Sequence, residues 1–133
     1  MRKYATDARL QAGLITKESY MKIKDIARLL NAQVLTPEIS VETEVHTACG
    51  SDMMSDVLAY VKDQAVLITG LNNPQVIRTA NMMDMVCVVF VRGKVPNEMT
   101  LDLARESGIC VLHADIPMFA CCGKLYEAGL RGA

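Results

Sequence analysis

Residues 65–93 constrain the fold more strongly than any other part of the chain. The runs AVLIT at 65–69 and MVCVVFV at 85–91 are apolar, and residues 71–84 between them have helical spacing. Two strands joined by a helical crossover lie parallel to one another. Neither run alternates polar and apolar residues, so we expect both strands to be buried on both faces. The sequence therefore predicts an α/β fold in which helices cover a sheet.

The turn that starts the predicted helix has the residues that such a turn needs. Asn73 can accept a hydrogen bond as the N-cap, and Pro74 suits the first helical position, where no amide donor is required. The residues expected to face the sheet recur at helical spacing and are Val76, Ile77, Ala80 and Met83.

The rest of the chain continues the alternation of helices and strands. Further helices are predicted at residues 21–31, after a cap at Ser51 or Ser55, at residues 96–107 and at residues 117–129. Strands are predicted at 32–36, 45–49 and 109–113. The apolar residues that recur are Met53, Met54, Val57, Leu58 and Val61 in the second of these helices, and Met99, Leu101, Leu103 and Ala104 in the third. We expect layers of helix, sheet and helix around a mainly parallel sheet, with a mixed sheet left open by the N-terminal strands.

The chain divides at about Met21. Residues 1–20 are polar and weakly periodic, and we interpret them as an N-terminal extension that is either flexible or helical. Residues 21–133 have no internal boundary and are expected to form a single α/β domain, since a chain of 133 residues is one domain's worth.

Charge and cysteine usage exclude several classes of protein. The net charge is −1, which gives no electrostatic case for a nucleic acid or an anionic membrane as partner. No apolar run reaches the roughly 18 residues that a bilayer-spanning helix needs. The five cysteines are odd in number and no signal peptide precedes them, so we expect reduced thiols and a cytoplasmic location.

Polar and glycine residues follow several of the predicted strands. In open parallel sheets, ligands bind beyond the carboxyl ends of the strands. Glycine, asparagine and arginine there can hold a phosphate or carboxylate through helix-start amides and a forked guanidinium, although the same residue types also form ordinary turns and caps. The candidate ligand-binding residues are Gly50, Ser51, Asp52, Gly70, Asn72, Asn73, Arg78 and Arg92.

The chain lacks the common catalytic and nucleotide-binding motifs. The turn TGLNNPQ has neither the second glycine nor the lysine of a Walker loop, and it is not GxGxxG. His46 and His113 are the two histidines, which restricts general-base chemistry. Cys121 and Cys122 are adjacent and lack the two-residue gap of a zinc clamp. We therefore assign no catalytic residue, no metal site and no cofactor.

Five segments resemble the DRTGG domain family in order and spacing. They are MKIKDIARLLNAQVLT, ACGSDMMSDVLAYV, LITGLNNPQVIRTANM, VVFVRGKVP and MFACCGKLYEAGL, which together span Met21 to Leu130. Members of this family are fused to CBS domains in regulated pyrophosphatases, occur near the N-terminal part of some phosphotransacetylases, and have a fold similar to the N-terminal domain of HPr kinase. The resemblance implies an α/β domain that dimerises and serves regulation, with no chemistry of its own.

The chain departs from the Asp-Arg-Thr-Gly-Gly sequence that gives the family its name. The matching turn follows Leu67-Ile68-Thr69-Gly70 and has the sequence LNNPQ. The turn itself is retained, with Gly70, Asn72 and Asn73. Because the sequence contains no attached catalytic or CBS domain, we expect from the resemblance a stand-alone version that acts on a partner protein.

Three functional hypotheses follow. The first is a non-catalytic regulatory or interaction domain, homodimeric, that senses a nucleotide or other anionic metabolite. The second is a small phosphoryl- or acyl-transfer enzyme, which requires Ser51, Arg92 and His113 to converge in one pocket. The third is a thiol or metal-binding protein built on the cysteines Cys49, Cys87, Cys110, Cys121 and Cys122.

Overall fold

A computed structural model describes residues 20–60, 63–93 and 95–132 and has a five-stranded sheet at its centre. The strand order is β2-β7-β6-β5-β4. The four parallel strands are β4 (Thr47–Gly50), β5 (Ala65–Thr69), β6 (Cys87–Val91) and β7 (Cys110–Ala114). The fifth strand, β2 (Gln33–Val34), pairs antiparallel with β7. The sheet is therefore mixed but mainly parallel, as the sequence predicts.

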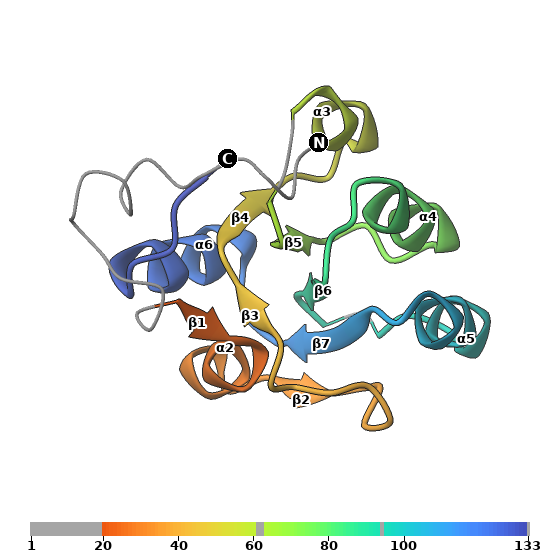
Figure 1. Ribbon diagram of the computed structural model, residues 1–133, viewed down its shortest axis with the longest axis horizontal. Helices are drawn as coiled ribbons and strands as arrows, with labels where there is room; N and C mark the ends of the chain where they lie inside the picture. Colours follow the sequence, from red (N-terminus) through yellow and green to blue (C-terminus); the bar gives the residue numbers. More distant parts are fainter. Residues whose placement is uncertain (1–19, 61–62, 94, 133) are drawn as a thin grey trace.

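Helices cover the sheet on both faces (Figure 1). α3 (Met54–Ala59), α4 (Pro74–Met82) and α5 (Glu98–Ser107) lie on one face. α2 (Ile23–Leu30) and α6 (Met118–Glu127) lie on the other. Right-handed crossovers explain this division, because the strands from β4 to β7 advance in one direction across the sheet and each connecting helix then returns on the same side. The predicted helix–sheet–helix architecture is confirmed.

The unit formed by β5, α4 and β6 has the structure expected from its sequence. All residues of β5 and β6 are buried, and Val66 pairs with Cys87 in the parallel register. The side-chain oxygen of Asn73 accepts a hydrogen bond from the amide of Gln75 at 3.0 Å, and Pro74 is the first helical residue. Continuous apolar strands and a correctly capped helix thus place this unit at the centre of the fold.

The N-terminal part adds a small second sheet. β1 (Met21–Lys22) pairs antiparallel with β3 (Glu44–Val45). α2 ends at Asn31, whose left-handed conformation stops the helix as predicted. The single strand predicted at 45–49 is wrong, because the chain divides at His46 between the small sheet and β4.

The N-cap predicted for α3 is wrong, and some of the recurring apolar residues of α3 and α5 are exposed. Met53, rather than Ser51 or Ser55, is the N-cap residue of α3, and Ser51 accepts the amide of Met53 in the loop before the helix. Met99 is exposed, since α5 buries Thr100, Leu101 and Ala104 instead. In α3, Val57 is buried and Met53 and Leu58 are exposed. Val61, which the sequence places on the same helix, lies outside the described residues.

The C-terminal segment returns along the outer edge of the sheet. Arg131 forms a parallel bridge with Thr47, and the amide of Ala48 donates to the carbonyl of Arg131 at 3.0 Å. This pairing supplies hydrogen bonds to an edge strand that is otherwise open. None of the helices in the described part of the chain combines the length and apolarity needed to cross a bilayer.

Candidate functional site

The carboxyl ends of the four parallel strands meet at one edge of the sheet, here called the rim (residues 50–52, 69–73, 92–93 and 113–115). The register sets the strand ends level, with Gly50 beside Ile68, Thr69 beside Phe90 and Phe90 beside His113. The predicted convergence of the strand ends is therefore present. What the side chains do at the rim depends on how they pair.

Asp52 joins the ends of β4 and β5. Its Oδ1 accepts hydrogen bonds from the amide of Gly70 at 2.7 Å and from the hydroxyl of Thr69 at 3.1 Å. The hydrogen bond from Gly70, followed by the contributions of Thr69 and Arg92, lowers the pKa of the Asp52 carboxyl group below its ordinary value. The ionised carboxylate thus occupies donors that would otherwise face an anion from solution.

Arg92 lies across the backbone of Gly70. It has a left-handed backbone conformation with φ +67°, and its Nη2 lies 3.6 Å from Oδ2 of Asp52. A Cβ atom at Gly70 would clash with the guanidinium group, so glycine is needed for this close approach. The side chains of Arg92 and Asp52 are 55% and 45% exposed, and a pair this open contributes about 1 kcal/mol or less. An anionic ligand that binds the guanidinium more strongly can therefore replace Asp52 as the partner of Arg92.

The other candidate residues have more ordinary surroundings. The side chain of Asn73 is used as the N-cap of α4, and Asn72 is partly exposed in the same turn. Arg78 is exposed on α4 and forms no ion pair with any described residue. A Cβ at Gly50 would lie 2.7 Å from the sulfur of Cys122, because α6 packs closely there. The rim therefore brings Asp52, Gly70 and Arg92 together, but not Arg78.

Ser51 and His113 do not form a nucleophile–base pair. They follow β4 and lie in β7, which are separated by β5 and β6, so the strand spacing alone puts them roughly 14 Å apart. The hydroxyl of Ser51 hydrogen-bonds within its own turn, to the carbonyl of Met53. The Nε2 of His113 lies 2.6 Å from the carbonyl oxygen of Arg92. Only His113 and Arg92 meet, and they meet through the backbone, so the transfer-enzyme hypothesis has no support here.

Three of the cysteines, Cys87, Cys110 and Cys121, are buried, and Cys49 and Cys122 are half-buried. Cys87 and Cys110 pair in register on β6 and β7, and the contact with Cys110, together with burial, raises the pKa of the Cys87 thiol. Cys121 is fully buried, and none of the five cysteines, all of which are described, forms a disulfide. Within the described ranges, no three His, Cys, Asp or Glu side chains group in a way that could hold a metal ion. The thiol or metal hypothesis gains no support from this arrangement.

A second polar cluster lies where the chain divides between the two sheets. The Nδ1 of His46 lies 3.2 Å from Oδ2 of Asp63, and its Nε2 lies 3.7 Å from Oε1 of Glu44. The ring of His46 stacks on that of Tyr20, with centroids 4.0 Å apart. No sequence pattern connects these residues, because they come from three separate segments. Their contact accompanies the break between β3 and β4, and no local sequence pattern predicts that break.

Comparisons with known proteins agree with this fold. The family model described as DRTGG domain matches residues 25–125. No curated protein sequence matches the chain. A crystal structure of the CBS and DRTGG domains of the regulatory region of Clostridium perfringens pyrophosphatase, complexed with the activator diadenosine tetraphosphate, has a TM-score of 0.64 at 14% identity. The similarity covers 94% of this chain and 52% of that one, so the chain spans about half the length of the solved regulatory region.

Proposed function

Because the chain belongs to the DRTGG domain family, we propose that it is a non-catalytic regulatory domain that works as a homodimer and senses a nucleotide or another anionic metabolite. The regulatory region with the similar fold was crystallised with a nucleotide activator, which supports this class of ligand. Regulation requires a partner protein on which the domain acts. The cysteines, none of them in a disulfide, support a cytoplasmic location.

The placement of Arg92 is the observation that carries the proposal. Its guanidinium is half exposed and lies over a glycine, where a planar group can approach without meeting a side chain. A guanidinium fork binds phosphate through two parallel hydrogen bonds, which a single carboxylate oxygen at 3.6 Å does not match. We assign Arg92 as the main contact for the phosphate groups of the ligand.

Asp52 then acts as the built-in competitor of the ligand. It holds Thr69 and Gly70 through one oxygen and faces Arg92 through the other. A bound phosphate draws Arg92 away from Asp52 and places a second negative charge near that carboxylate. The strand ends of β4 and β5 are joined by Asp52, so binding at Arg92 changes the contact between them. This coupling gives the domain a way to report the ligand to a partner.

The test is calorimetric titration with adenosine triphosphate and diadenosine tetraphosphate, with adenosine as the uncharged control. We expect both nucleotides to bind and adenosine to bind far more weakly. Arg92→Ala should abolish the binding of the nucleotides, and Asp52→Asn should tighten it, because the amide keeps an acceptor for Gly70 but removes the competing charge.

Arg28→Ala is the matched control, since Arg28 is an exposed arginine on α2 whose ion-pair partner is Asp25, whereas Arg92 faces Asp52. This variant should bind like the unmodified protein. An absence of binding at millimolar nucleotide, or binding that survives Arg92→Ala unchanged, would contradict the assignment.

A further inference from the structure

The outward side of α6 carries an apolar stripe, made of Phe119, Gly123 and Tyr126 with the half-buried Cys122 at its edge. These residues are spaced i, i+3, i+4 and i+7 and therefore lie on one side of the helix. Phe119 is 90% exposed and Tyr126 is 61% exposed. The opposite side of α6 is already buried against the sheet through Cys121 and Leu125. α6 is thus apolar on two sides, whereas a helix whose outer side faces solvent is apolar only on the side that faces the core.

Gly123 lies in the interior of α6 without a reason inside this chain. A Cβ atom built on Gly123 meets no atom within 4 Å, so the fold leaves room for a side chain there. Glycine in a helix interior costs about 1 kcal/mol relative to alanine. A close approach of another backbone explains such a glycine, because the distance between two packed helices depends on the side chains at the contact.

The α6 stripe is complementary to its own two-fold image. An antiparallel pairing of two copies centred between Cys122 and Gly123 sets Phe119 opposite Tyr126 of the partner subunit. Aromatic rings that meet in this way gain more than their buried area alone. A shallow and open depression of about 510 Å³ lies over the stripe and Glu127, and the ring of Phe119 from the partner subunit would lie in it. A symmetric dimer requires this kind of self-complementary surface.

The area of the stripe agrees with a weak dimer. Two aromatic side chains from each copy, exposed to the extent given above, remove roughly 600 Å² from water when they cover one another, and the residues at the edge of the stripe add a smaller amount. A total below about 1,200 Å² is the size of weak and transient protein contacts. The chain's net charge of −1 leaves little repulsion between copies.

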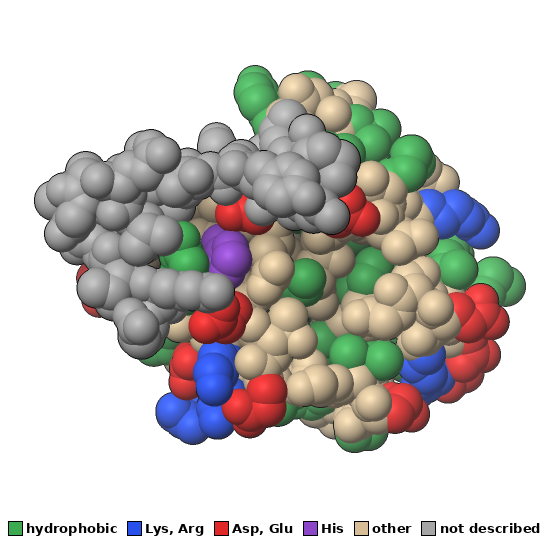
Figure 2. Space-filling model, in the orientation of Figure 1, with side chains coloured by type: hydrophobic (Ala, Val, Ile, Leu, Met, Phe, Trp, Pro, Cys, Tyr) green, Lys and Arg blue, Asp and Glu red, His purple; other side chains and the backbone are tan. Residues whose placement is uncertain are grey.

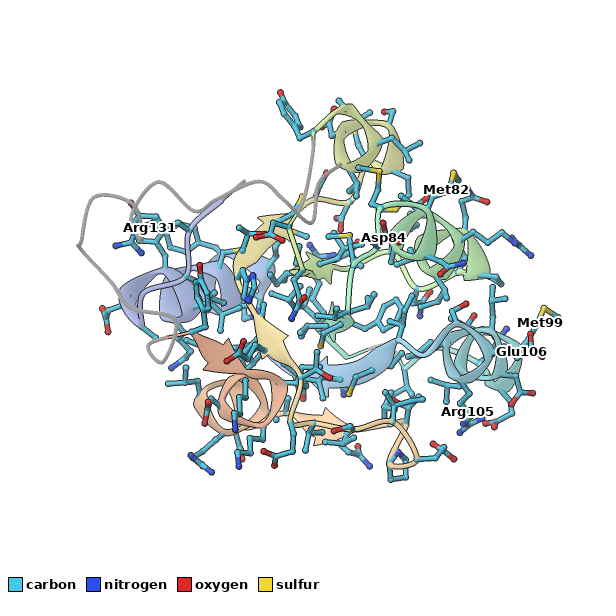
Figure 3. The ribbon with its side chains drawn as sticks, viewed as in Figure 1. Met82, Asp84, Met99, Arg105, Glu106 and Arg131 are labelled. Carbon is cyan, nitrogen blue, oxygen red and sulfur yellow. The ribbon has the colours of Figure 1, made fainter. Side chains whose placement is uncertain are left out.

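We infer that a second copy of this chain docks on the α6 stripe, with α6 packed antiparallel against α6 of the partner subunit. This inference rests on the homodimer of the proposed function and names the surface that forms it. Figure 3 shows Arg131 beside α6, and its guanidinium lies over one face of Tyr126 at 3.9 Å. The contact fixes the ring of Tyr126 and leaves less of its motion to be lost on docking.

The test is sedimentation equilibrium over a range of protein concentrations. We expect the unmodified chain to be a dimer with a dissociation constant in the micromolar range. Phe119→Glu should raise that constant at least tenfold, because it removes a central aromatic anchor and places a charge opposite Tyr126. The matched control is Met99→Glu. Met99 is also exposed but lies on α5, on the other face of the sheet, so dimerisation should not change.

Gly123→Ala supplies a second and independent measurement. In dilute solution, where the chain is monomeric, the variant should have a higher melting temperature than the unmodified protein. At high concentration its dimer should be weaker, because the added methyl group separates the helices. A stabilised monomer with a weakened dimer is a combination that general damage to the fold does not produce.

The outcomes separate the surface from the rest of the proposal. A chain that is monomeric at several hundred micromolar overturns both the docking surface and the homodimer. A dimer that survives Phe119→Glu and Gly123→Ala overturns the α6 surface alone and leaves the homodimer in place. Nucleotide binding at the rim is measured separately, so its failure leaves this inference standing.

Discussion

The helices α5 and α6 flank the same strand, yet their outer sides differ. Each is ten residues long, α5 leads into β7 and α6 follows it, and they pack on opposite faces of the sheet (Figure 1). Their inner sides are equivalent, since each buries a leucine, Leu101 in α5 and Leu125 in α6. The comparison therefore isolates the side that faces away from the sheet.

The outer side of α5 is polar and charged. Arg105 forms ion pairs with Glu38, Glu98 and Asp102 at 3.2, 2.7 and 2.8 Å. Figure 2 shows acidic and basic side chains next to each other over this helix. Met99 is a single exposed apolar residue, which is ordinary on a protein surface. The outer side of α6 has instead two exposed aromatic rings around a glycine. The difference supports the inference that the outer side of α6 contacts a partner, whereas the outer side of α5 faces solvent.

The largest losses of stability are expected on the sides of α5 and α6 that face the sheet, where the two helices are equivalent. Leu101→Ala and Leu125→Ala should each lower the free energy of unfolding by about 2–5 kcal/mol, because each leaves a cavity beside the sheet. Urea unfolding of dilute protein measures both. A loss at one leucine that is many times the loss at the other would break the equivalence of the inner sides.

The N-terminal cap of α5 should have the next largest effect. The side chain of Asn97 accepts hydrogen bonds from the amide of Thr100 at 3.0 Å and from its hydroxyl at 2.9 Å. Asn97→Ala should cost about 1 kcal/mol of unfolding free energy, whereas Asn97→Ser should cost much less because it keeps an acceptor. Equal losses in the two variants, measured by thermal unfolding, would show that the cap is not the cause.

The two glycines should respond with opposite signs when replaced by alanine. Gly108 ends α5 with φ +71°, a conformation that costs an alanine about 1 kcal/mol. Gly108→Ala should therefore lower the free energy of unfolding, and Gly123→Ala should raise it by up to about 1 kcal/mol in dilute protein. Destabilisation by both substitutions would mean that Gly123 serves the monomer.

The ion pairs of Arg105 should have the smallest effect. The pKa of Glu38 is lowered by a backbone hydrogen bond and by Arg105, so the contribution of this pair is present above the ordinary carboxyl pKa and is lost as the pH falls below it. Arg105→Ala should reduce stability slightly at pH 7 and low salt, and not at pH 3 or high salt. Melting temperatures under these four conditions check the prediction, and a difference that persists at pH 3 would contradict it.

Much of the fold can be predicted from the sequence where several signals agree. At 65–93, apolar strands, a capping asparagine and a first-turn proline all indicate one structure, and the structure has it. Met99 shows where the spacing of apolar residues alone is insufficient. The buried side of α5 includes Thr100 and excludes Met99, although only Met99 is apolar. The contact between His46 and Asp63 is not local either, because 17 residues separate them and only the folded chain brings them close.

The rim is partly predictable for the same reason. Parallel strands end at one edge, so the sequence can place Asp52, Gly70 and Arg92 near one another. It does not show that Asp52 binds the amide of Gly70, since that contact depends on the register of β4 against β5. It also does not show the left-handed conformation of Arg92, which directs the guanidinium over Gly70. The contacts within the rim therefore depend on how the strands pair, whereas the sequence shows only which residues lie there.

The most direct test of the partner-facing role of α6 is nuclear magnetic resonance on a mixture of isotopically labelled and unlabelled chains. A filtered experiment then detects only those proton contacts that join two copies. We expect contacts between the ring of Phe119 in one copy and the ring of Tyr126 in the other, with none between residues of α5. A dimer whose contacts lie elsewhere, or a spectrum without any contact between copies at high concentration, would contradict the account.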